Sequence, residues 1–215
     1  MLSFPLTLDA SLPSASGRSS TTTFRATSWT SARPDNASSW ANISTEHTDR
    51  PLPDSPLIGV ISDTHGLLRP EAINALGGAD LIVHAGDVGN LGILDALRAI
   101  APVFAIRGNV DGGEWARDLP KTEVVEVDAV KLYIIHDVNE LDLSPETARF
   151  DAVISGHSHS PSVVKRNGVL FLNPGSAGPR RFKLPVTIAR IQVRGESLEA
   201  QLVELDLEAT PSRSY

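Results

Sequence analysis

The stretch LIGVISDTHG at residues 57–66 joins an apolar, β-branched run to a group of polar side chains that can bind metals. The stretches DLIVHAGD at residues 80–87 and VFAIRGNVD at residues 103–111 repeat this order. Residues 70–76 and 91–100 lie between them and have the apolar spacing of helices. Strands that alternate with helices at this spacing predict a βαβαβ unit, and therefore a parallel sheet. The predicted strands are residues 57–62, 80–85 and 103–107.

Beyond this unit the chain becomes rich in β-branched residues and turn signals. The pair Asn167-Gly168 is the strongest signal, because both residues readily adopt the left-handed backbone of a tight hairpin turn. Residues 144–149 begin with Ser-Pro and predict a short capped helix. The predicted strands are residues 123–127, 130–135, 152–155, 162–166, 169–172, 185–193 and 198–205. We therefore expect one α/β (α+β) domain over residues 57–206, followed by a tail at residues 207–215.

Residues 1–56 have a different composition, dominated by Ser, Thr and Pro, and no apolar periodicity organises them. Such a segment buries too little apolar surface to offset the entropy lost on folding, so we expect a disordered N-terminal extension. Arginines outnumber acids before Asp35, which leaves a targeting peptide as an alternative. A start site placed too far upstream is a third interpretation.

The composition excludes several classes of protein. Because the chain has no Cys, it holds no disulfide framework, zinc finger, iron–sulfur cluster or thiol nucleophile, and nitrogen and oxygen must bind any metal. A formal net charge of −7 argues against binding long nucleic acids, which requires clustered Lys and Arg. No apolar run approaches the roughly 18 residues of a membrane-spanning helix, so we expect a cytoplasmic protein without a membrane partner. The composition is compatible with a homo-oligomer.

The carboxyl ends of parallel strands meet at one edge of a sheet, and several metal-ligand side chains fall there. They are Asp63, His65, Asp87 and Asn109 after the first three strands, and His136, His157 and His159 after later ones. Residues i and i+2 of an extended chain face the same side, so Asp63 with His65, and His157 with His159, can each present two ligands into one space. A lone His at a strand end is usually a hydrogen-bonded structural residue, and we assign His84 this role. The convergence of the others favours metal binding.

Two Asp, one Asn and four His are enough ligands for two divalent ions that share one carboxylate. Asp87, on the middle strand of the unit, is the expected bridging ligand. Imidazole together with carboxylate suits Mn, Ni, Fe, Co or Zn better than Ca or Mg. Two ions about 3.5–4 Å apart can clamp the attacking and leaving oxygens of a phosphoryl displacement. We therefore expect phosphoric ester hydrolysis by a hydroxide that bridges the two metals.

An ordered series of motifs makes the sequence similar to a known family. The motifs are Asp63-Thr64-His65, Gly86-Asp87, Gly108-Asn109-Val110-Asp111, His136, Gly156-His157-Ser158-His159 and Asn173-Pro174-Gly175-Ser176. The series resembles the calcineurin-like metallophosphoesterases, most closely their compact bacterial and archaeal phosphodiesterase branch. The resemblance implies a four-layer fold of two packed β-sheets flanked by helices, and hydrolysis of a small phosphodiester. The ligands that it implies are Asp63, His65, Asp87 and His159 for one metal, and Asp87, Asn109, His136 and His157 for the other.

The sequence departs from the family pattern at two positions. Val110 stands where larger protein phosphatases have a His that is thought to protonate the leaving group. Because Val carries no transferable proton, we expect substrates with acidic leaving groups, or a proton supplied by His65 or water. Asp137 follows His136 where many relatives have Gly, so we expect the loop over the second metal to sit differently. Arg107 precedes the Gly-Asn motif and is expected to bind phosphate through its guanidinium fork.

The expected catalytic residues are Asp87, Asn109, His65 and Arg107. Arg180 and Arg181 either contact the rest of a phosphodiester or lie in a solvated loop. The alternative function is a non-catalytic scaffold on the same fold, as the small subunit of the retromer coat is understood to be. Loss of metal ligands would mark such a protein, and all seven are present here. A dinucleotide-binding oxidoreductase is disfavoured, because the first strand leads into Asp-Thr-His instead of Gly-x-Gly-x-x-Gly.

Overall fold

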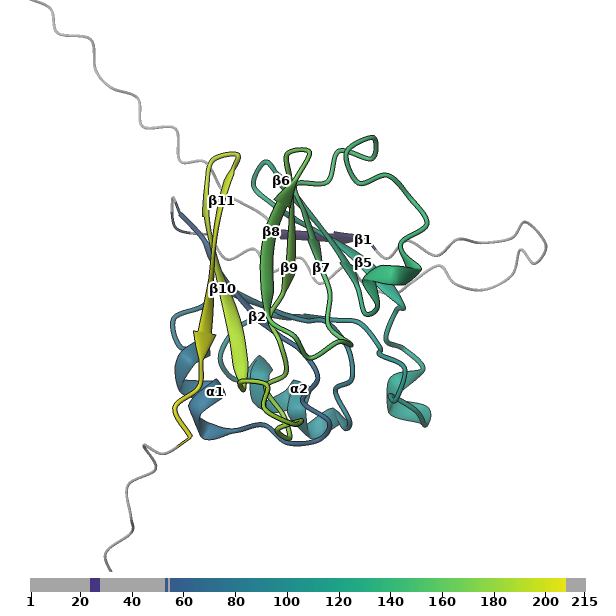
Figure 1. Cartoon of the computed structure of the whole chain (residues 1–215), viewed down its shortest axis with the longest axis vertical. Coiled ribbons are helices and arrows are strands. Elements are labelled where there is room, and N and C mark those ends of the chain that lie inside the picture. The colour runs from purple at the N-terminus through teal and green to yellow at the C-terminus, as the bar shows by residue number, and fades with distance from the viewer. Residues whose placement is uncertain (1–23, 28–52, 54, 208–215) are drawn as a thin grey trace, which may run out of the picture.

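The computed structural model describes residues 24–27, 53 and 55–207, in which two β-sheets pack face to face (Figure 1). The predictions for the N-terminal extension and the C-terminal tail fall mostly on residues outside these ranges. The predicted fold class is confirmed: both sheets are mixed, and the helices are few. No helix of the described residues is both long and apolar enough to cross a bilayer.

The first sheet has five strands in the order β11-β10-β2-β3-β4. They are β2 (Leu57–Ile61), β3 (Leu81–His84), β4 (Val103–Ala105), β10 (Thr187–Arg194) and β11 (Ser197–Glu204). β2, β3 and β4 are parallel, which confirms the βαβαβ prediction, and the antiparallel pair β10 and β11 lies beside β2. Because the parallel strands end at the same edge, Asp63, Asp87 and Asn109 follow them there.

The second sheet has six strands in the order β1-β5-β6-β7-β9-β8. They are β1 (Phe24–Thr27), β5 (Thr122–Val127), β6 (Val130–Ile135), β7 (Ala152–Ile154), β8 (Ser162–Arg166) and β9 (Val169–Asn173). The two predicted hairpins, β5-β6 and β8-β9, are confirmed. β1 lies within residues 1–56, where the sequence predicts no strand, and pairs antiparallel with β5. β6 and β7 are parallel, so His136 and the segment 155–159 emerge at the same edge of this sheet.

The main core lies between the two sheets and consists of aliphatic side chains from their inner faces. Ile58 and Val60 of β2 and Leu132 and Ile134 of β6 belong to this core, and all four are fully buried. Burying each such side chain contributes roughly 1.5–3 kcal/mol to folding. A second core lies under the helices α1 (Pro70–Leu76) and α2 (Leu91–Arg98) on the outer face of the five-stranded sheet.

The outer face of the six-stranded sheet is covered by the connection between β6 and β7 instead of by a long helix. Two short 3₁₀ helices occur in the domain, η1 (Glu114–Ala116) and η2 (Val138–Glu140). The helix predicted at residues 144–149 is wrong, because the segment forms successive turns and ends with Arg149 in left-handed backbone (φ 59°). This reversal places Phe150 against Tyr133, with ring centroids 5.0 Å apart. Packing onto the sheet therefore overrides the local helix signal.

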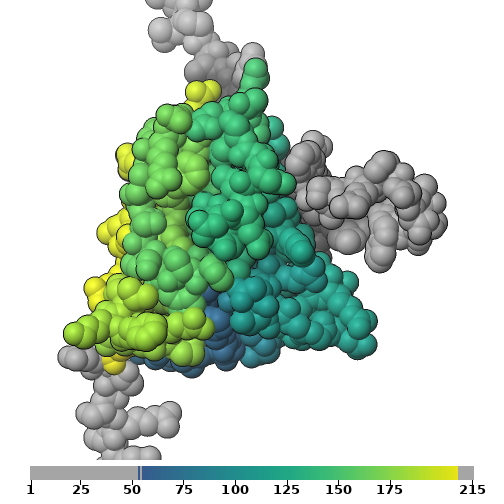
Figure 2. All heavy atoms as spheres, turned by 45° about the vertical axis from the view of Figure 1, so that its right-hand side comes forward, coloured from purple at the N-terminus to yellow at the C-terminus, as the bar shows by residue number. Residues whose placement is uncertain are grey.

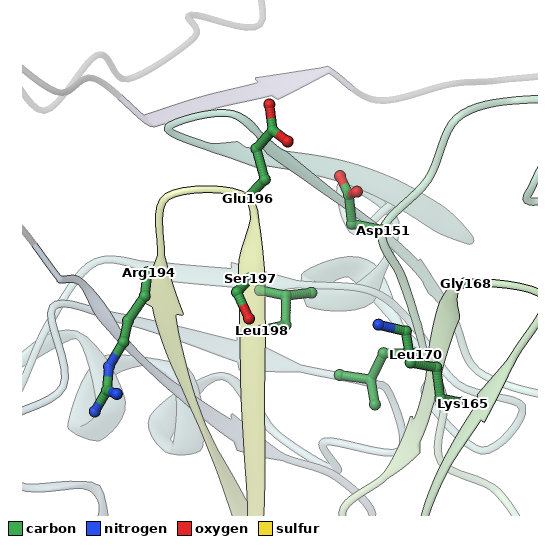
Figure 3. A pocket seen from close by; sticks show the side chains of 8 residues that line it. All are labelled: Asp151, Lys165, Gly168, Leu170, Arg194, Glu196, Ser197 and Leu198. Carbon is green, nitrogen blue, oxygen red and sulfur yellow. The ribbon is translucent and has the colours of Figure 1, made fainter.

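A polar hollow of about 360 Å³ lies at the end of the sandwich where the β8-β9 and β10-β11 turns meet (Figure 3). Its lining includes Asp151, Lys165 and Glu196. β2 begins at this end, since Leu57 pairs with Gln192 near the β10-β11 turn. The metal-ligand side chains follow the opposite ends of the parallel strands, so this hollow is separate from them.

Candidate metal centre

The predicted ligands are carried on loops whose backbone departs from that of the strands. β2 ends at Ile61 and β7 at Ile154, so the segments that hold the ligands are not extended. The extended backbone that the sequence predicts for these segments is therefore wrong, although Asp63 and His65 do turn their ligand atoms into one space. Instead, left-handed backbone aims five of the ligands, and each such non-glycine residue costs on the order of 1 kcal/mol. These residues are Asp63 (φ 54°), His65 (φ 47°), Asp87 (φ 55°), His157 (φ 65°) and His159 (φ 58°).

Asp63, His65 and His159 form the first cluster. Nε2 of His159 lies 3.2 Å from Oδ1 of Asp63 and 3.2 Å from Nε2 of His65. The two imidazole rings are stacked, with centroids 5.2 Å apart. Oδ2 of Asp87 lies 3.8 Å from Nε2 of His65, which connects this cluster to the next. The three side chains therefore turn nitrogen and oxygen atoms toward one small space.

Asp87, Asn109, His136 and His157 form the second cluster. Nε2 of His136 lies 3.3 Å from Oδ2 of Asp87 and 3.0 Å from Oδ1 of Asn109, and Nδ1 of His157 lies 3.1 Å from the same amide oxygen. Nδ1 of His136 donates to the carbonyl of Ala85 at 2.7 Å, which leaves its Nε2 lone pair free to bind a metal. The two His of residues 157–159 thus belong to different clusters.

The two clusters fit divalent ions. The Oδ1 atom of Asp63 is buried and has no hydrogen-bond partner among the described residues. Within that same part of the chain, no Lys or Arg forms an ion pair with Asp63 or Asp87, although both carboxylates are buried. Potential ligand atoms of Asp63, Asp87 and His136 all lie within 4.8 Å of one another, so the clusters are contiguous. Imidazole, carboxylate and amide donors in this arrangement suit transition-metal ions.

Electrostatics in the cluster favour positive charge between the carboxylates. Burial lowers the pKa of His65, although the charges of Asp87 and Asp63 act in the opposite direction. Burial acts to raise the pKa of Asp87, but hydrogen bonds from His136 and a backbone amide lower it overall. Burial acts to lower the pKa of His136, and hydrogen bonds to Asp87 and to the carbonyl of Ala85 outweigh this and raise it. A divalent cation meets the same demand for positive charge.

Asp111 and Gly108 hold the Asp87 and Asn109 loops together. The carboxylate of Asp111 accepts hydrogen bonds from the amides of Val88, Gly89 and Gly108 at 2.8–3.1 Å. A Cβ atom at Gly108 would collide with the carboxylate of Asp87, so only glycine permits this approach. The loops are therefore fixed relative to each other without direct contact by Asp111 with the ligand atoms.

Asn173 and Ser176 do the same for the other ligand loops. The amide of Asn173 donates to the carbonyl of Gly156 at 2.7 Å and to the hydroxyl of Ser158 at 3.1 Å. The hydroxyl of Ser176 donates to the carbonyl of Asp63 at 2.9 Å. The Asn-Pro-Gly-Ser motif thus supports the loops that carry the first cluster.

His84 and Arg107 lie beside the centre with different surroundings. His84 is fully buried, with Nε2 2.9 Å from the hydroxyl of Thr64, and burial lowers its pKa to about 4. It is therefore neutral near pH 7, which fits a structural role. The amide of Arg107 donates to the carbonyl of Pro120 at 2.8 Å. Its guanidinium makes no hydrogen bond or ion pair with another described residue, so its phosphate-binding role stays a prediction.

Asp137 has a contact that sequence reasoning missed. Its Oδ2 atom lies 3.7 Å from Nε2 of His157, the nitrogen that faces away from Asn109. Its Oδ1 atom accepts the amide of Asn139 and caps η2. In the sequence, Asp137 directly follows His136, and this position predicted a changed loop. It did not predict that the carboxylate faces the imidazole of His157.

The comparisons with known proteins agree with this geometry. Residues 57–196 match the sequence profile of the calcineurin-like phosphoesterase superfamily domain. A probable metallophosphoesterase of Methanocaldococcus jannaschii is 37% identical over 163 residues, which cover 70% of this chain and 82% of that protein. A solved archaeal phosphodiesterase is 26% identical, with a TM-score of 0.58, and the match covers 68% of this chain and 99% of that one.

A likeness of fold alone extends to a protein with a different name. Vacuolar protein sorting 29 of Cryptosporidium parvum has a TM-score of 0.58 at 19% identity, and the match covers 71% of this chain and 98% of that one. The profile match, by contrast, spans most of the folded domain and includes all seven predicted ligands. The motifs therefore predict the family and the enzyme class correctly: the chain belongs to the calcineurin-like phosphoesterase superfamily, and the relatives named above are a metallophosphoesterase and a phosphodiesterase, which are hydrolases acting on phosphoric ester bonds.

Proposed function

We propose that this protein hydrolyses a small phosphodiester with the help of two divalent metal ions. The observation that carries the proposal is the joining of two ligand clusters by buried carboxylates that no Lys or Arg of the described residues neutralises. Two ions that share a carboxylate can activate a hydroxide between them near neutral pH and absorb charge from both ester oxygens.

The proposed ligands divide between the two ions as the clusters do. One ion would be held by the first cluster together with Asp87, and the other by the second cluster. Asp87 is the proposed shared ligand, because its Oδ2 atom lies 3.8 Å from Nε2 of His65 and 3.3 Å from Nε2 of His136. Its Oδ1 atom accepts the amide of Val110 at 3.0 Å, which fixes the carboxylate plane. Mn, Ni, Fe, Co and Zn are the candidate metals.

The side chains around the proposed metal site restrict which leaving groups the reaction can accept. The side chain of Val110 lies at the rim next to Asn109 and cannot donate a proton. The leaving group must therefore be acidic, or else receive its proton from His65 or water. We propose that Arg107 binds a nonbridging phosphate oxygen, since its guanidinium has no other partner among the described residues.

Hydrolysis by chelator-treated protein tests this function. An aryl phosphodiester and the matching monoester are supplied, and Mn²⁺, Ni²⁺, Co²⁺, Zn²⁺ and Mg²⁺ are added back singly. We expect a transition metal to restore diester cleavage, with slower cleavage of the monoester. No rate with any metal, in protein shown by circular dichroism to be folded, would contradict the proposal.

A non-catalytic scaffold is the alternative, and the fold likeness to vacuolar protein sorting 29 is what raises it. A protein that only binds other proteins has no need to keep buried carboxylates side by side without a Lys or Arg to neutralise them. The Oδ1 atom of Asp63, which has no hydrogen-bond partner among the described residues, and the retention of all seven ligands therefore favour the enzyme. Absence of hydrolysis in folded, metal-loaded protein would shift the weight to the scaffold.

A further inference from the structure

The loop at residues 178–183 borders the metal centre directly. A Cβ atom at Gly178 would lie 2.6 Å from the carbonyl oxygen of Asp63, so this loop packs against the backbone of the first ligand loop. Nε of Arg69 donates to the carbonyl of Gly178 at 3.3 Å, and the amide of Ala177 donates to the carbonyl of Ser62 at 3.1 Å. In Figure 2 the yellow-green surface of the chain after β9 lies beside the blue surface of the chain after β2. The loop is thus fixed at the edge of the site.

Phe182, within this loop, is unusual in both exposure and backbone. Its side chain is 95% exposed, whereas Phe150 and Phe171 are packed against the six-stranded sheet. Its φ of 51° lies in the left-handed region, which is strained for a bulky residue. An exposed aromatic side chain on strained backbone lowers the stability of the fold, because it buries no surface in the core. Such exposed apolar side chains often mark binding sites, so we look for a ligand that covers Phe182.

Arg181 places a positive charge beside the same edge. Arg180 is engaged by its loop, since its Nε donates to the carbonyl of Leu184 at 3.3 Å. The guanidinium of Arg181 has no such partner among the described residues. It lies three residues after Gly178, whose backbone packs against the carbonyl of Asp63. Arg181 therefore lies on the loop that borders the first cluster, and its guanidinium is free to pair with an anion.

Other exposed apolar side chains flank the ligands. Val110 is 53% exposed directly after Asn109, and Leu67 and Val138 are exposed two residues after His65 and His136. A site for inorganic phosphate or a polar sugar ester would have no use for these side chains. Apolar side chains beside a few polar and charged groups are typical of pockets for organic ligands.

We propose that the substrate phosphodiester carries a planar aromatic group, which stacks on Phe182 while Arg181 pairs with the phosphate anion. This inference rests on the proposed function and adds the class of ester to it. Stacking on an aromatic side chain is tolerant of the exact ring, so a nucleobase or another aryl group meets the same requirement. Arg181 supplies the charge-assisted contact to the anion that every phosphodiester carries.

Direct binding to full-length, Mn²⁺-loaded protein tests the proposal. Calorimetry compares diphenyl phosphate with diethyl phosphate, two monoanions that differ only in the aromatic groups. We expect wild-type protein to bind the diphenyl ester about tenfold more tightly. Phe182→Ala removes this preference, and Phe182→Tyr retains it. Arg181→Met weakens both ligands by a similar factor of about ten, because both share the phosphate. Val164→Ala, at an exposed position on β8, changes neither.

The outcomes separate this inference from the proposed function. A wild-type protein without preference, or a preference unchanged by Phe182→Ala, would overturn the role of the loop. Phe182 is so exposed that its replacement leaves the fold intact, and circular dichroism verifies this. Hydrolysis of bis(4-nitrophenyl) phosphate is measured on the same samples. Turnover without a preference for the diphenyl ester would support the proposed hydrolysis and contradict the role of Phe182. A preference without turnover would support the aromatic site and contradict the proposed hydrolysis.

Discussion

The two ends of the sandwich use the same backbone conformation for different purposes. At the hairpin end, left-handed residues include Asp128 (φ 54°), Asn167 (φ 48°) and Gly168 (φ 88°), types that adopt it at little cost. At the metal end the same conformation is imposed on three His and two Asp, among them His65 and His159. Those loops are held by long-range hydrogen bonds, whereas the hairpin turns are local. The difference indicates that the fold maintains backbone strain at the metal end, where the left-handed conformation orients the ligand side chains.

The largest effect is expected when an Asp in left-handed backbone is replaced at each end of the sandwich. Asp87→Asn should reduce metal-dependent diester hydrolysis by a factor on the order of 10³ or more, because the proposed shared carboxylate loses its charge. Asp128→Asn, in the left-handed turn between β5 and β6, should leave the rate unchanged. Steady-state kinetics with an aryl diester measures both.

Unfolding in urea provides the control for Asp87→Asn. The variant should still unfold cooperatively, since an amide oxygen can accept the Val110 amide as the carboxylate does. Unchanged hydrolysis by a folded Asp87→Asn protein would remove the shared-ligand role.

Glu123 sharpens the comparison, because it is a buried acid at the metal end that belongs to neither cluster. It is 8% exposed on β5 and pairs with Ile134, two residues before His136. Burial raises its pKa from 4.5 to about 7. Above pH 7 the folded protein must bear an ionised, desolvated carboxylate, so stability falls as the pH rises from about 4.5 through 7.

The size of this loss of stability follows from the raised pKa of Glu123. A raised pKa of this extent corresponds to on the order of 3 kcal/mol of stability lost at pH 8.5 relative to acidic pH. Glu123→Gln should remove that loss, whereas Glu126→Gln, whose side chain pairs with Lys131 at 2.9 Å, should not. Urea denaturation of the three proteins at pH 5 and pH 8.5 measures the difference. Equal pH dependence in wild type and Glu123→Gln would contradict the assignment.

Asp137→Asn is expected to have the smallest effect of these changes. The amide keeps the cap on η2 but removes the negative charge that faces Nε2 of His157 at 3.7 Å. Loss of a carboxylate that contacts a metal-binding imidazole typically lowers metal affinity 10–100-fold. Because this contact is long, we expect a loss of about tenfold. The control is Asp118→Ala, an exposed acid on the same domain. Metal titrations that show no difference between the two variants would leave Asp137 with the cap alone.

Much of the fold could be predicted because its signals are local. Helix α1 spans residues 70–76, as the sequence predicts, since proline begins it and the apolar spacing continues to Leu76. The Asn167-Gly168 turn joins β8 to β9 for the same reason. The convergence of the ligands followed from one topological fact, the common edge at which parallel strands end.

The remainder depends on contacts between distant residues, which a sequence pattern does not encode. Nothing local predicts left-handed backbone at Asp63, whose amide donates to the carbonyl of Gly86 at 3.0 Å. The helix signal after Ser144 was real, since its hydroxyl accepts the amide of Thr147 at 3.3 Å, but the demands of packing onto the sheet ended it within one turn. The contact of Asp137 with His157 likewise joins segments 20 residues apart.

The number of metal ions bound per chain tests the central claim most directly. Elemental analysis after dialysis against Mn²⁺ should find two ions in the wild-type protein, one in His136→Ala and one in His159→Ala, because each variant removes a ligand from one cluster only. The double variant should retain none. Two ions in His136→Ala, or a single ion in the wild-type protein, would contradict the two-cluster account of the metal end.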